Sequence, residues 1–433
     1  MAKDRPRWDR SIAALLIAVF CSAAASLVAV TALGIQVYDL THRELDLGLL
    51  GLAEFTPSAL LVLVTGSVAD RFRRVRIIAI SAAVQASAGV GLAVYAASDP
   101  TSATPIFALV LLFGAARAFL APSNRALPAD VVTAARLPWL TARRAAAWQW
   151  AVIAGPILAG FLYAADPVLP YVATACLLAI ASLSTFLIET RESDRLAAAD
   201  ADLDVIEEVA DPSAVPALTT SRLREAVEGL AFIRRSPILL GVISLDLFAV
   251  LFGGAVALLP AIAQDRLGVG SVGLGWLRAA GGIGAVLVTL IITRRPVRRR
   301  VGRVLLVSVA TFGIATIVLG ATRTYALAFI AMAVLAGADS ISVFIRSTLV
   351  PLVTPRQKRG RVMAVESVFI GASNELGAFE SGVVGQLIGA PLAIVSGGAA
   401  TLAVAGLYWA RFPALRGIDR FPATSEVSDG RDG

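Results

Sequence analysis

Long apolar runs alternate with short polar stretches along the whole chain. A helix needs about 20 apolar residues to cross the roughly 30 Å hydrocarbon core of a bilayer. Runs of about this length lie at residues 12–36, 46–68, 75–97, 104–125, 143–164, 168–188, 237–262, 271–292, 302–322, 325–350, 362–388 and 391–412. The pattern therefore predicts an all-α integral membrane protein with twelve transmembrane helices.

Basic residues gather in every second connection between the apolar runs. They precede residue 12 and cluster in or beside the connections at 69–74, 126–142, 293–301 and 351–361, whereas the alternate connections hold only Arg43, Arg266 and Arg323. Cytoplasmic loops of membrane proteins carry the excess of lysine and arginine. We therefore expect a multi-pass protein of the cell (inner) membrane with both termini in the cytoplasm.

One long connection, residues 189–236, separates the first six runs from the last six. Its first part is polar and acidic, which is typical of a solvated, partly disordered linker. Its last part carries apolar residues three or four positions apart between arginines, at Leu223, Val227, Leu230 and Ile233. This spacing predicts an amphipathic helix at the cytoplasmic membrane interface.

The two groups of six runs show a weak internal repeat. Gly114 and Pro128 in the first group recur as Gly337 and Pro351 in the second, an offset of 223 residues. Parallel repeats of this size are a known plan of transporters. We therefore expect two pseudo-symmetric six-helix bundles. The expected division is a cytoplasmic N-terminal tail (1–11), the first bundle (12–188), the cytoplasmic linker (189–236), the second bundle (237–412) and a cytoplasmic C-terminal tail (413–433).

Composition agrees with a bilayer as the solvent. Hydrophobic residues make up 57% and charged residues 16% of the chain, against about 45–50% and about 25% in soluble proteins. The net charge of +7 comes from arginines that lie between apolar runs. This distribution indicates membrane topology, and we expect no nucleic acid partner.

The sequence contains few of the residues that a metalloprotein, an ATP-driven pump or an enzyme would need. His42 is the only histidine, and the two cysteines, Cys21 and Cys176, each lie in an apolar run, so we expect no metal site and no disulfide framework. The phosphate-binding motif Gly-x-x-x-x-Gly-Lys-Ser/Thr of ATP-driven pumps is missing from the sequence. A carboxylate-based membrane enzyme is the one enzymatic alternative that remains. We expect a transporter without a cofactor.

The second apolar run ends in Gly66-Ser-Val-Ala-Asp70-Arg71-Phe-Arg73-Arg74. This stretch resembles the loop 2–3 motif Gly-x-x-x-Asp-Arg-x-x-Arg-Arg/Lys of the major facilitator superfamily. A carboxylate and guanidinium at this place pair with each other or with neighbouring helix ends. We expect Gly66, Asp70, Arg71 and Arg74 to control conformational exchange rather than the choice of cargo. The alternative is a plain positive-inside loop.

The fifth run carries Gly155, Pro156 and Gly160. They resemble the antiporter motif of the same superfamily, Gly-x-x-x-Gly-Pro-x-x-Gly-Gly, although Ala151 and Ala159 stand where that motif has glycines. A kinked helix with a small-residue packing face explains these residues equally well.

Further stretches resemble one branch of the superfamily, which includes the enterobactin exporter and the macrolide-efflux-type drug:proton antiporters. They lie at residues 36–41, 117–122, 359–366, 372–377 and 380–382. The resemblance implies a monomer in which helices 1, 4, 7 and 10 line a central cavity. It also implies proton-driven efflux, by alternating access, of a small amphiphilic molecule that is siderophore-like or drug-like. The alternatives are a lipid flippase or a non-efflux metabolite transporter of the same fold.

Ionisable side chains inside the apolar runs are candidates for function, because each costs at least about 2.5–3.5 kcal/mol to insert. The proton-coupling candidates are Asp246, Glu375, Glu54 and Asp339, and the substrate-cavity candidates are Arg117, Asp339 and Arg346. Asp246 ranks first because it lies near the middle of its run without a charged residue within one turn. We expect a lone carboxylate there, able to take up and release protons near neutral pH. Glu375 ranks second, since helix packing competes as its explanation.

Overall fold

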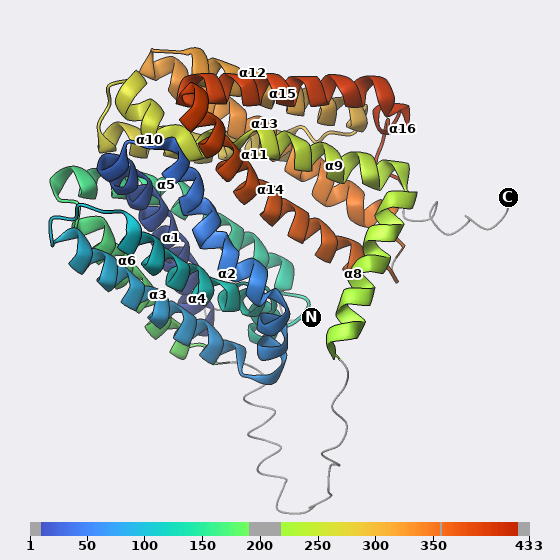
Figure 1. Cartoon of the computed structure of the whole chain (residues 1–433). Coiled ribbons are helices and arrows are strands. Elements are labelled where there is room, and N and C mark those ends of the chain that lie inside the picture. The colour runs from blue at the N-terminus through green and yellow to red at the C-terminus, as the bar shows by residue number, and fades with distance from the viewer. Residues whose placement is uncertain (1–9, 190–217, 356, 423–433) are drawn as a thin grey trace, which may run out of the picture. The chain divides into compact units, whose positions relative to one another are not determined.

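The computed structural model describes residues 10–189, 218–355 and 357–422, without the side chains of residues 62–64, 66, 67, 69–71, 121, 122 and 218–226. This part of the chain forms helices and no β-strand (Figure 1). Within it, ten helical segments are long and apolar enough to cross a membrane. The fold is therefore that of an all-α membrane protein. The tails and the acidic part of the 189–236 connection lie largely outside the described residues.

Two of the twelve predicted crossings are not among those ten segments. Residues 46–68 lie in α2 (Glu44–Arg71) and residues 362–388 in α14 (Arg359–Ile388), which have 28 and 30 residues. Both are long enough to span a bilayer at 1.5 Å per residue. Charged residues lower the mean hydropathy of α14, and α2 contains residues outside the described side chains, so the full count of twelve stays a prediction.

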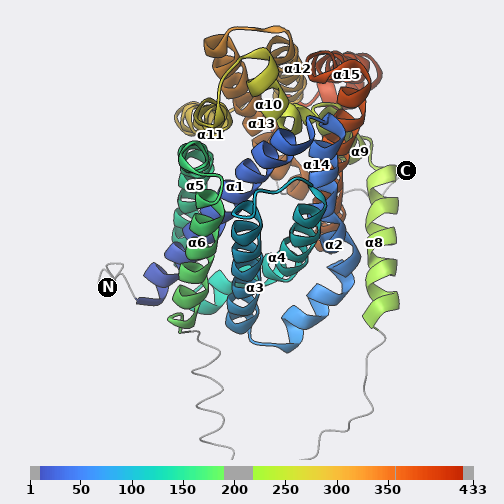
Figure 2. The ribbon, with the colours of Figure 1, turned by 60° about the vertical axis from the view of Figure 1, so that its left-hand side comes forward.

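The chain contacts divide the molecule into two compact units. The first unit holds residues 1–36 and 53–216. Its helices are most of α1 (Arg10–Thr41) and of α2, with α3 (Arg74–Ala96), α4 (Thr104–Val131), α5 (Leu137–Ala165) and α6 (Leu169–Phe186). Helix α3 packs against both α4 and α6 (Figure 2). Gly89 lets α3 approach α6, because a methyl group there would stand 3.3 Å from the backbone nitrogen of Ala175.

The second unit holds residues 37–52 and 217–433. In it, α12 packs against α13 and α15, and α11 packs against α13. Its elements are α8 (Leu218–Arg235), α9 (Pro237–Phe252), η1 (Gly254–Leu258), α10 (Leu259–Ala261), η2 (Ile262–Arg266), α11 (Ser271–Arg294), α12 (Val301–Ala321), α13 (Tyr325–Val353), α14, α15 (Ala390–Arg411) and α16 (Pro413–Arg416).

The predicted crossing at 237–262 lies within one helical segment, Pro237–Arg266, that is long and apolar enough to cross a membrane, but this segment is not a single α-helix. Helix α9 ends at Phe252 and is followed by the 3₁₀ turn η1, the short α10 and the π-helical turn η2. Gly254 lies at the break, and a methyl group at this position would collide with the backbone carbonyl of Gly377 on α14. Glycine is the residue that permits such a close approach of two backbones.

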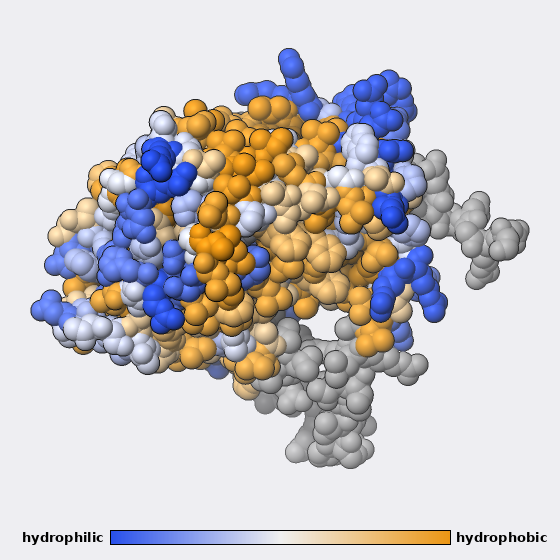
Figure 3. Space-filling model, turned by 45° about the horizontal axis from the view of Figure 1, so that its top comes forward, coloured by the Kyte–Doolittle hydropathy of each residue, from blue (hydrophilic) through white to orange (hydrophobic). Residues whose placement is uncertain are grey.

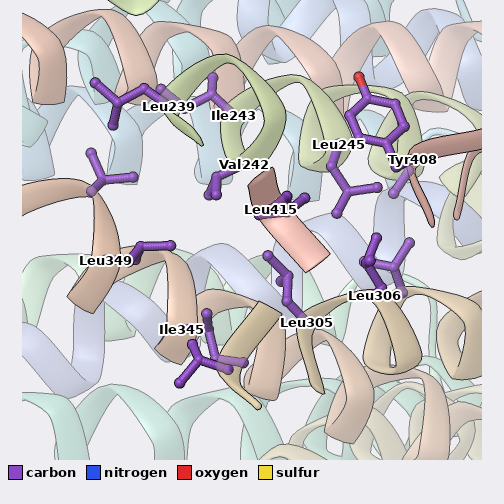
Figure 4. Close-up of a cluster of buried hydrophobic side chains, with 14 of the residues drawn as sticks. Leu239, Val242, Ile243, Leu245, Leu305, Leu306, Ile345, Leu349, Tyr408 and Leu415 are labelled. Atoms are coloured by element: carbon purple, nitrogen blue, oxygen red, sulfur yellow. The ribbon is translucent and has the colours of Figure 1, made fainter. Parts of the chain in front are cut away.

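A cluster of buried apolar side chains fixes the positions of α9 and α13. Figure 4 shows Val242 and Leu245 of α9 facing Leu305 of α12, Ile345 of α13 and Leu415 of α16. Between helices in a bilayer, association rests on close packing rather than on the hydrophobic effect. This cluster therefore sets the register of α9 against α13, and with it the places of the charged residues on those two helices.

The second unit has a largely apolar outer face over α12 and α15, as contact with a bilayer requires. Figure 3 shows a broad hydrophobic area with hydrophilic residues gathered at its sides. Large apolar side chains are exposed on α12 and α15, among them Val307, Ile314, Leu392 and Leu407. An exposed apolar area of this kind is expected where lipid replaces water.

Candidate functional site

Three charged side chains from three helices meet inside the second unit. Arg346 of α13 forms an ion pair with Asp246 of α9, and its Nε atom lies 3.8 Å from Glu366 Oε1 of α14. The side chains of Arg346, Asp246 and Glu366 are only 7%, 8% and 11% exposed. We call these residues the buried triad; its formal charge is −1 when both carboxylates are ionised.

The expectation that Asp246 is a lone carboxylate is wrong. Its partner Arg346 lies 100 positions further along the sequence, on a helix that packs against α9. The expectation counted charges only within one turn of the same helix. The packing of α9 against α13 brings the guanidinium to Asp246, because an unpaired charge inside a bundle is costly.

Asp339 adds a third carboxylate next to the buried triad. It lies seven residues before Arg346 on α13, and it lines a cavity of about 10 Å³ together with Asp246, Ser308 and Ser342. A cavity of this size has room for about one water molecule. Asp339 forms no ion pair within the described part of the chain. The surroundings of Arg346 thus hold more carboxylates than cations.

Glu54 and Arg117 form an ion pair in the first unit. Gly114, one turn before Arg117 on α4, lies against α2 so closely that a methyl group would collide with the carbonyl oxygen of Glu54. This close approach lets the Arg117 guanidinium reach the Glu54 carboxylate. Arg117 is 46% exposed and Glu54 16% exposed, so this pair is far more open than the buried triad.

Of the four expected gating residues, only Arg74 has a described side chain. Gly66, Asp70 and Arg71 lie in α2, and their side chains are outside the described part of the structure. Arg74 Nη1 donates to both carboxylate oxygens of Asp130 near the end of α4, at 2.8 and 2.6 Å. The motif therefore links α3 to α4 through a charged pair that spans 56 residues of sequence.

The fifth-run motif forms a packing face. Gly155, Pro156 and Gly160 are buried in α5. A methyl group at Gly155 would stand 2.8 Å from the Cβ atom of Leu27 and 3.3 Å from the carbonyl oxygen of Ala24, both on α1. These contacts explain the small residues by close helix packing, and a specific antiport role stays a prediction.

Glu375 lies where α2 meets α14 in the second unit. A methyl group at Gly51 would stand 2.9 Å from Glu375 Oε2. Gly48 lies about one turn before Gly51 on α2. A methyl group at Gly382 of α14 would stand 2.8 Å from the Cα atom of Gly48, so the two backbones touch. The helix-packing explanation of Glu375 thus has direct support, and its role in proton coupling stays a prediction.

Residues 37–52 are also held by polar contacts that the sequence did not indicate. The Tyr38 hydroxyl donates to Asp265 Oδ2 at 2.5 Å, and Gln264 Nε2 donates to Asp39 Oδ1 at 2.5 Å. Both partners lie in η2, and π-helical turns are frequent at functional sites. Arg266 fixes the end of η2 by donating to the backbone carbonyl of Thr322 at 2.8 Å.

Sequence reasoning missed Glu366, Asp130 and Asp265 as partners of the charged residues. Glu366 stands in the quoted stretch 359–366, but it lies near the start of its apolar run and was not counted as a mid-membrane charge. A count of charges in the whole helix rather than in its middle would have included it. Asp130 and Asp265 fall in predicted connections, where charges are common, so the sequence offers no signal for them.

The sequence matches the model of one known protein family. The family model of the Major Facilitator Superfamily matches residues 15–378, which is most of the chain. The chain belongs to the major facilitator superfamily. It is therefore a membrane transporter of that superfamily's type, as the loop 2–3 motif predicted. A comparison with curated proteins found no match.

Solved transporter structures of the superfamily share the fold at low identity. A bacterial homologue of the human lysosomal transporter Spinster is 13% identical, with 95% of this chain and 97% of that chain covered and a TM-score of 0.68. A POT family transporter in complex with 5-aminolevulinic acid is 10% identical, with 94% and 96% covered and a TM-score of 0.69. The nucleoside transporter NupG is 16% identical, with 92% and 98% covered and a TM-score of 0.64. At these identities the likeness extends to the fold alone.

Proposed function

We propose that this superfamily member is a proton-coupled exporter of a small amphiphilic molecule, working by alternating access. The observation that supports proton coupling is the buried triad of Asp246, Arg346 and Glu366. It places two carboxylates against one guanidinium in a site that is almost closed to solvent. A buried site with an uncompensated charge is costly, and binding one proton removes that charge.

Arg346 can form an ion pair with either Asp246 or Glu366. When both carboxylates are ionised, Arg346 pairs with Asp246 and keeps Glu366 at 3.8 Å. A proton on an Asp246 oxygen weakens the first pair, and a shift of about 1 Å brings Arg346 to the ordinary ion-pair distance from Glu366. Proton binding is thereby converted into a small movement of α13 relative to α9 and α14. Proton entry also gains about 2.3 kcal/mol per charge per 100 mV of membrane potential.

Asp339 is a second carboxylate that can bind the proton beside the triad. The water-sized cavity between Asp339 and Asp246 is lined by the hydroxyls of Ser308 and Ser342. One water molecule there has enough polar neighbours to bridge the two carboxylates. We propose Asp339 as the residue that exchanges the proton with Asp246.

The export direction and the cargo rest on resemblance. The stretches at 359–366 and 372–382 are similar to the enterobactin-exporter and macrolide-efflux branch, which supports a siderophore-like or drug-like cargo. In the structure, Arg117 and Arg346 each pair with a carboxylate. An anionic cargo would have to displace Glu54 from Arg117, and the more exposed Arg117 is the better candidate for that contact.

The proposed setting is the cell (inner) membrane, with both termini cytoplasmic. The support is the alternation of arginine-rich connections along the sequence. Reporter fusions at residues 5 and 425 test this orientation. A reporter that is active only outside the cytoplasm would overturn it.

The experiment that tests proton coupling uses inverted membrane vesicles from cells that overproduce the full chain. A macrolide and a catecholate siderophore are added in turn after a pH gradient has been formed, and a pH-sensitive dye records its dissipation. We expect one of the two compounds to dissipate the pH gradient in vesicles that contain the unaltered protein, because its transport releases protons from the vesicle interior. We expect no such response with Asp246→Asn. A matched control is Asp419→Asn, an exposed carboxylate of the same unit near the end of the described chain.

Other outcomes identify the rival functions. Movement of a fluorescent phospholipid between leaflets, without dye response to either cargo, would indicate a lipid flippase. Cargo movement that is equal with and without a pH gradient would remove protons from the mechanism. A comparison of exported metabolites between deletion and overproducing cells extends the search beyond the two named probes.

A further inference from the structure

Helix α8 is docked on the protein rather than lying free at the membrane surface. Ile233 belongs to the core cluster of the second unit and is 2% exposed. A methyl group at Gly229 would stand 3.0 Å from the carbonyl oxygen of Arg361 on α14, so the two helices touch through their backbones. The amphipathic pattern therefore has its C-terminal apolar residues against α9 and α14.

A basic cavity of about 330 Å³ lies between α8 and the start of α14. It is lined by Glu228, Ala231, Phe232, Arg235, Lys358 and Arg361. Arg361 is paired with Glu228 at 2.6 Å, and the Lys358 ammonium lies 4.7 Å from the centre of the Phe232 ring. Arg235 and Lys358 have no carboxylate partner within the described part of the chain. Among the described residues, the lining carries three cations and one anion, a formal charge of +2.

We propose that this cavity binds the phosphate head group of an anionic phospholipid. Cavities of about 300 Å³ and more hold small ligands, and basic pockets beside transmembrane helices bind anionic head groups. Two unpaired cations supply the charge for one phosphate, and the Arg361 and Glu228 pair supplies a fixed wall. The proposal is independent of what the transporter carries.

The position of the cavity favours a lipid over a soluble phosphate compound. Helix α14 has 30 residues, so it is about 45 Å long, longer than the roughly 30 Å hydrocarbon core. Its first turn, which carries Arg361, therefore lies at the level of the head groups. Val227 on α8, next to the cavity residue Glu228, is 63% exposed. An exposed apolar side chain beside a basic cavity suits an acyl chain attached to the bound head group.

The test measures binding to the purified full chain in detergent by native mass spectrometry. Three probes are used separately: dioleoyl phosphatidylglycerol, the zwitterionic dioleoyl phosphatidylcholine and inorganic phosphate. One basic residue near an anionic membrane lipid contributes a factor of about five in affinity. We expect Lys358→Gln or Arg235→Gln to weaken phosphatidylglycerol binding about five-fold, and the double variant about 30-fold. Both side chains are exposed, so neither change threatens folding.

Two further variants separate anion binding from simple docking of α8. Glu228→Gln and Arg361→Gln break the same ion pair, but the first raises the charge of the cavity and the second lowers it. We expect Glu228→Gln to strengthen phosphatidylglycerol binding about five-fold and Arg361→Gln to weaken it by a similar factor. The matched control is Arg298→Gln with Arg299→Gln, two exposed basic residues in the connection between α11 and α12.

The expected set of results is a preference for phosphatidylglycerol over phosphatidylcholine that follows the cavity charge and not the control charge. Equal effects of Glu228→Gln and Arg361→Gln would overturn the proposal and leave the ion pair as a clamp for α8. Inorganic phosphate binding with the same charge dependence, without a lipid preference, would overturn the assignment to a lipid. Equal loss in the Arg298/Arg299 control would reduce the effect to general surface charge.

Discussion

Each unit contains an ion pair between transmembrane helices, but the two pairs have different surroundings. Glu54 and Arg117 in the first unit are one acid and one base, and the arginine is nearly half exposed. Asp246 and Arg346 in the second unit are buried, and Glu366 adds a second acid. Charged residues in transmembrane segments face a bundle interior or a water-filled cavity. The first pair is therefore open to water, whereas the buried triad is almost closed to it, and under the proposed mechanism the triad changes its charge by binding or releasing a proton.

The largest expected difference concerns removal of the arginine from each site. Arg346→Gln leaves two buried carboxylates without their cation, and breaking a buried pair in this way costs about 3–5 kcal/mol. Arg117→Gln removes the partner of a carboxylate in an open site, and exposed pairs are worth about 0–1 kcal/mol. Thermal unfolding of the purified variants in detergent, followed by intrinsic tryptophan fluorescence, measures both. Equal losses of stability would contradict the difference in surroundings.

A smaller effect is expected from the glycine that holds the first pair together. Gly114→Ala places a methyl group against the Glu54 carbonyl, and overpacking of a tight contact costs about 1–3 kcal/mol. The matched control is Gly360→Ala on α14, where nothing lies within 4 Å of the added methyl group. The same unfolding measurement gives the comparison. If both substitutions were neutral, the close approach of α4 to α2 would not be what positions Arg117.

The smallest effect on stability is expected when the triad is reduced to a simple pair. Glu366→Gln leaves Asp246 and Arg346 as one acid and one base, as in the first unit, and removes the uncompensated charge. We expect a change in unfolding free energy within about 1 kcal/mol, because no charge is left unpaired. Proton release in the inverted vesicles should nevertheless fall, with the exposed Asp419→Asn as the matched control. Unchanged proton release with Glu366→Gln would place the proton on Asp246 and Asp339 alone.

Most of the fold followed from the lengths of the apolar runs. The runs at 168–188 and 391–412 correspond to α6 and α15 within two residues at each end. The interruption after Phe252 was missed although Gly253 and Gly254 mark it, since transmembrane helices often contain glycine without breaking. The break lies where the chain packs closely against Gly377 on another helix, and a local sequence pattern contains no information on such a contact.

The candidate site was predicted in its residues but not in its pairing. Asp246, Asp339 and Arg346 were recognised as charges that a bilayer does not tolerate without a reason. Their arrangement depends on the packing of α9 against α13 and α14, which the hydrophobic spacing of each helix does not specify. Glu366 was overlooked because it lies near the start of its apolar run. Its separation of 20 residues from Arg346 in sequence gives no sign of the 3.8 Å between them in space.

Residues 37–52 have a consequence for anyone who wishes to cut or recombine this chain. They precede the long connection, yet they belong to the second unit, where Gly48 lies against Gly382 and the backbone nitrogen of Leu45 faces Gln386 Oε1 at 3.5 Å. A chimera joined to another family member within the long connection would therefore separate residues 37–52 from α14, against which they pack. Junctions at 36/37 and 52/53, in addition to the long connection, would transfer each unit whole. The modules that can be exchanged are thus defined by packing, not by chain order.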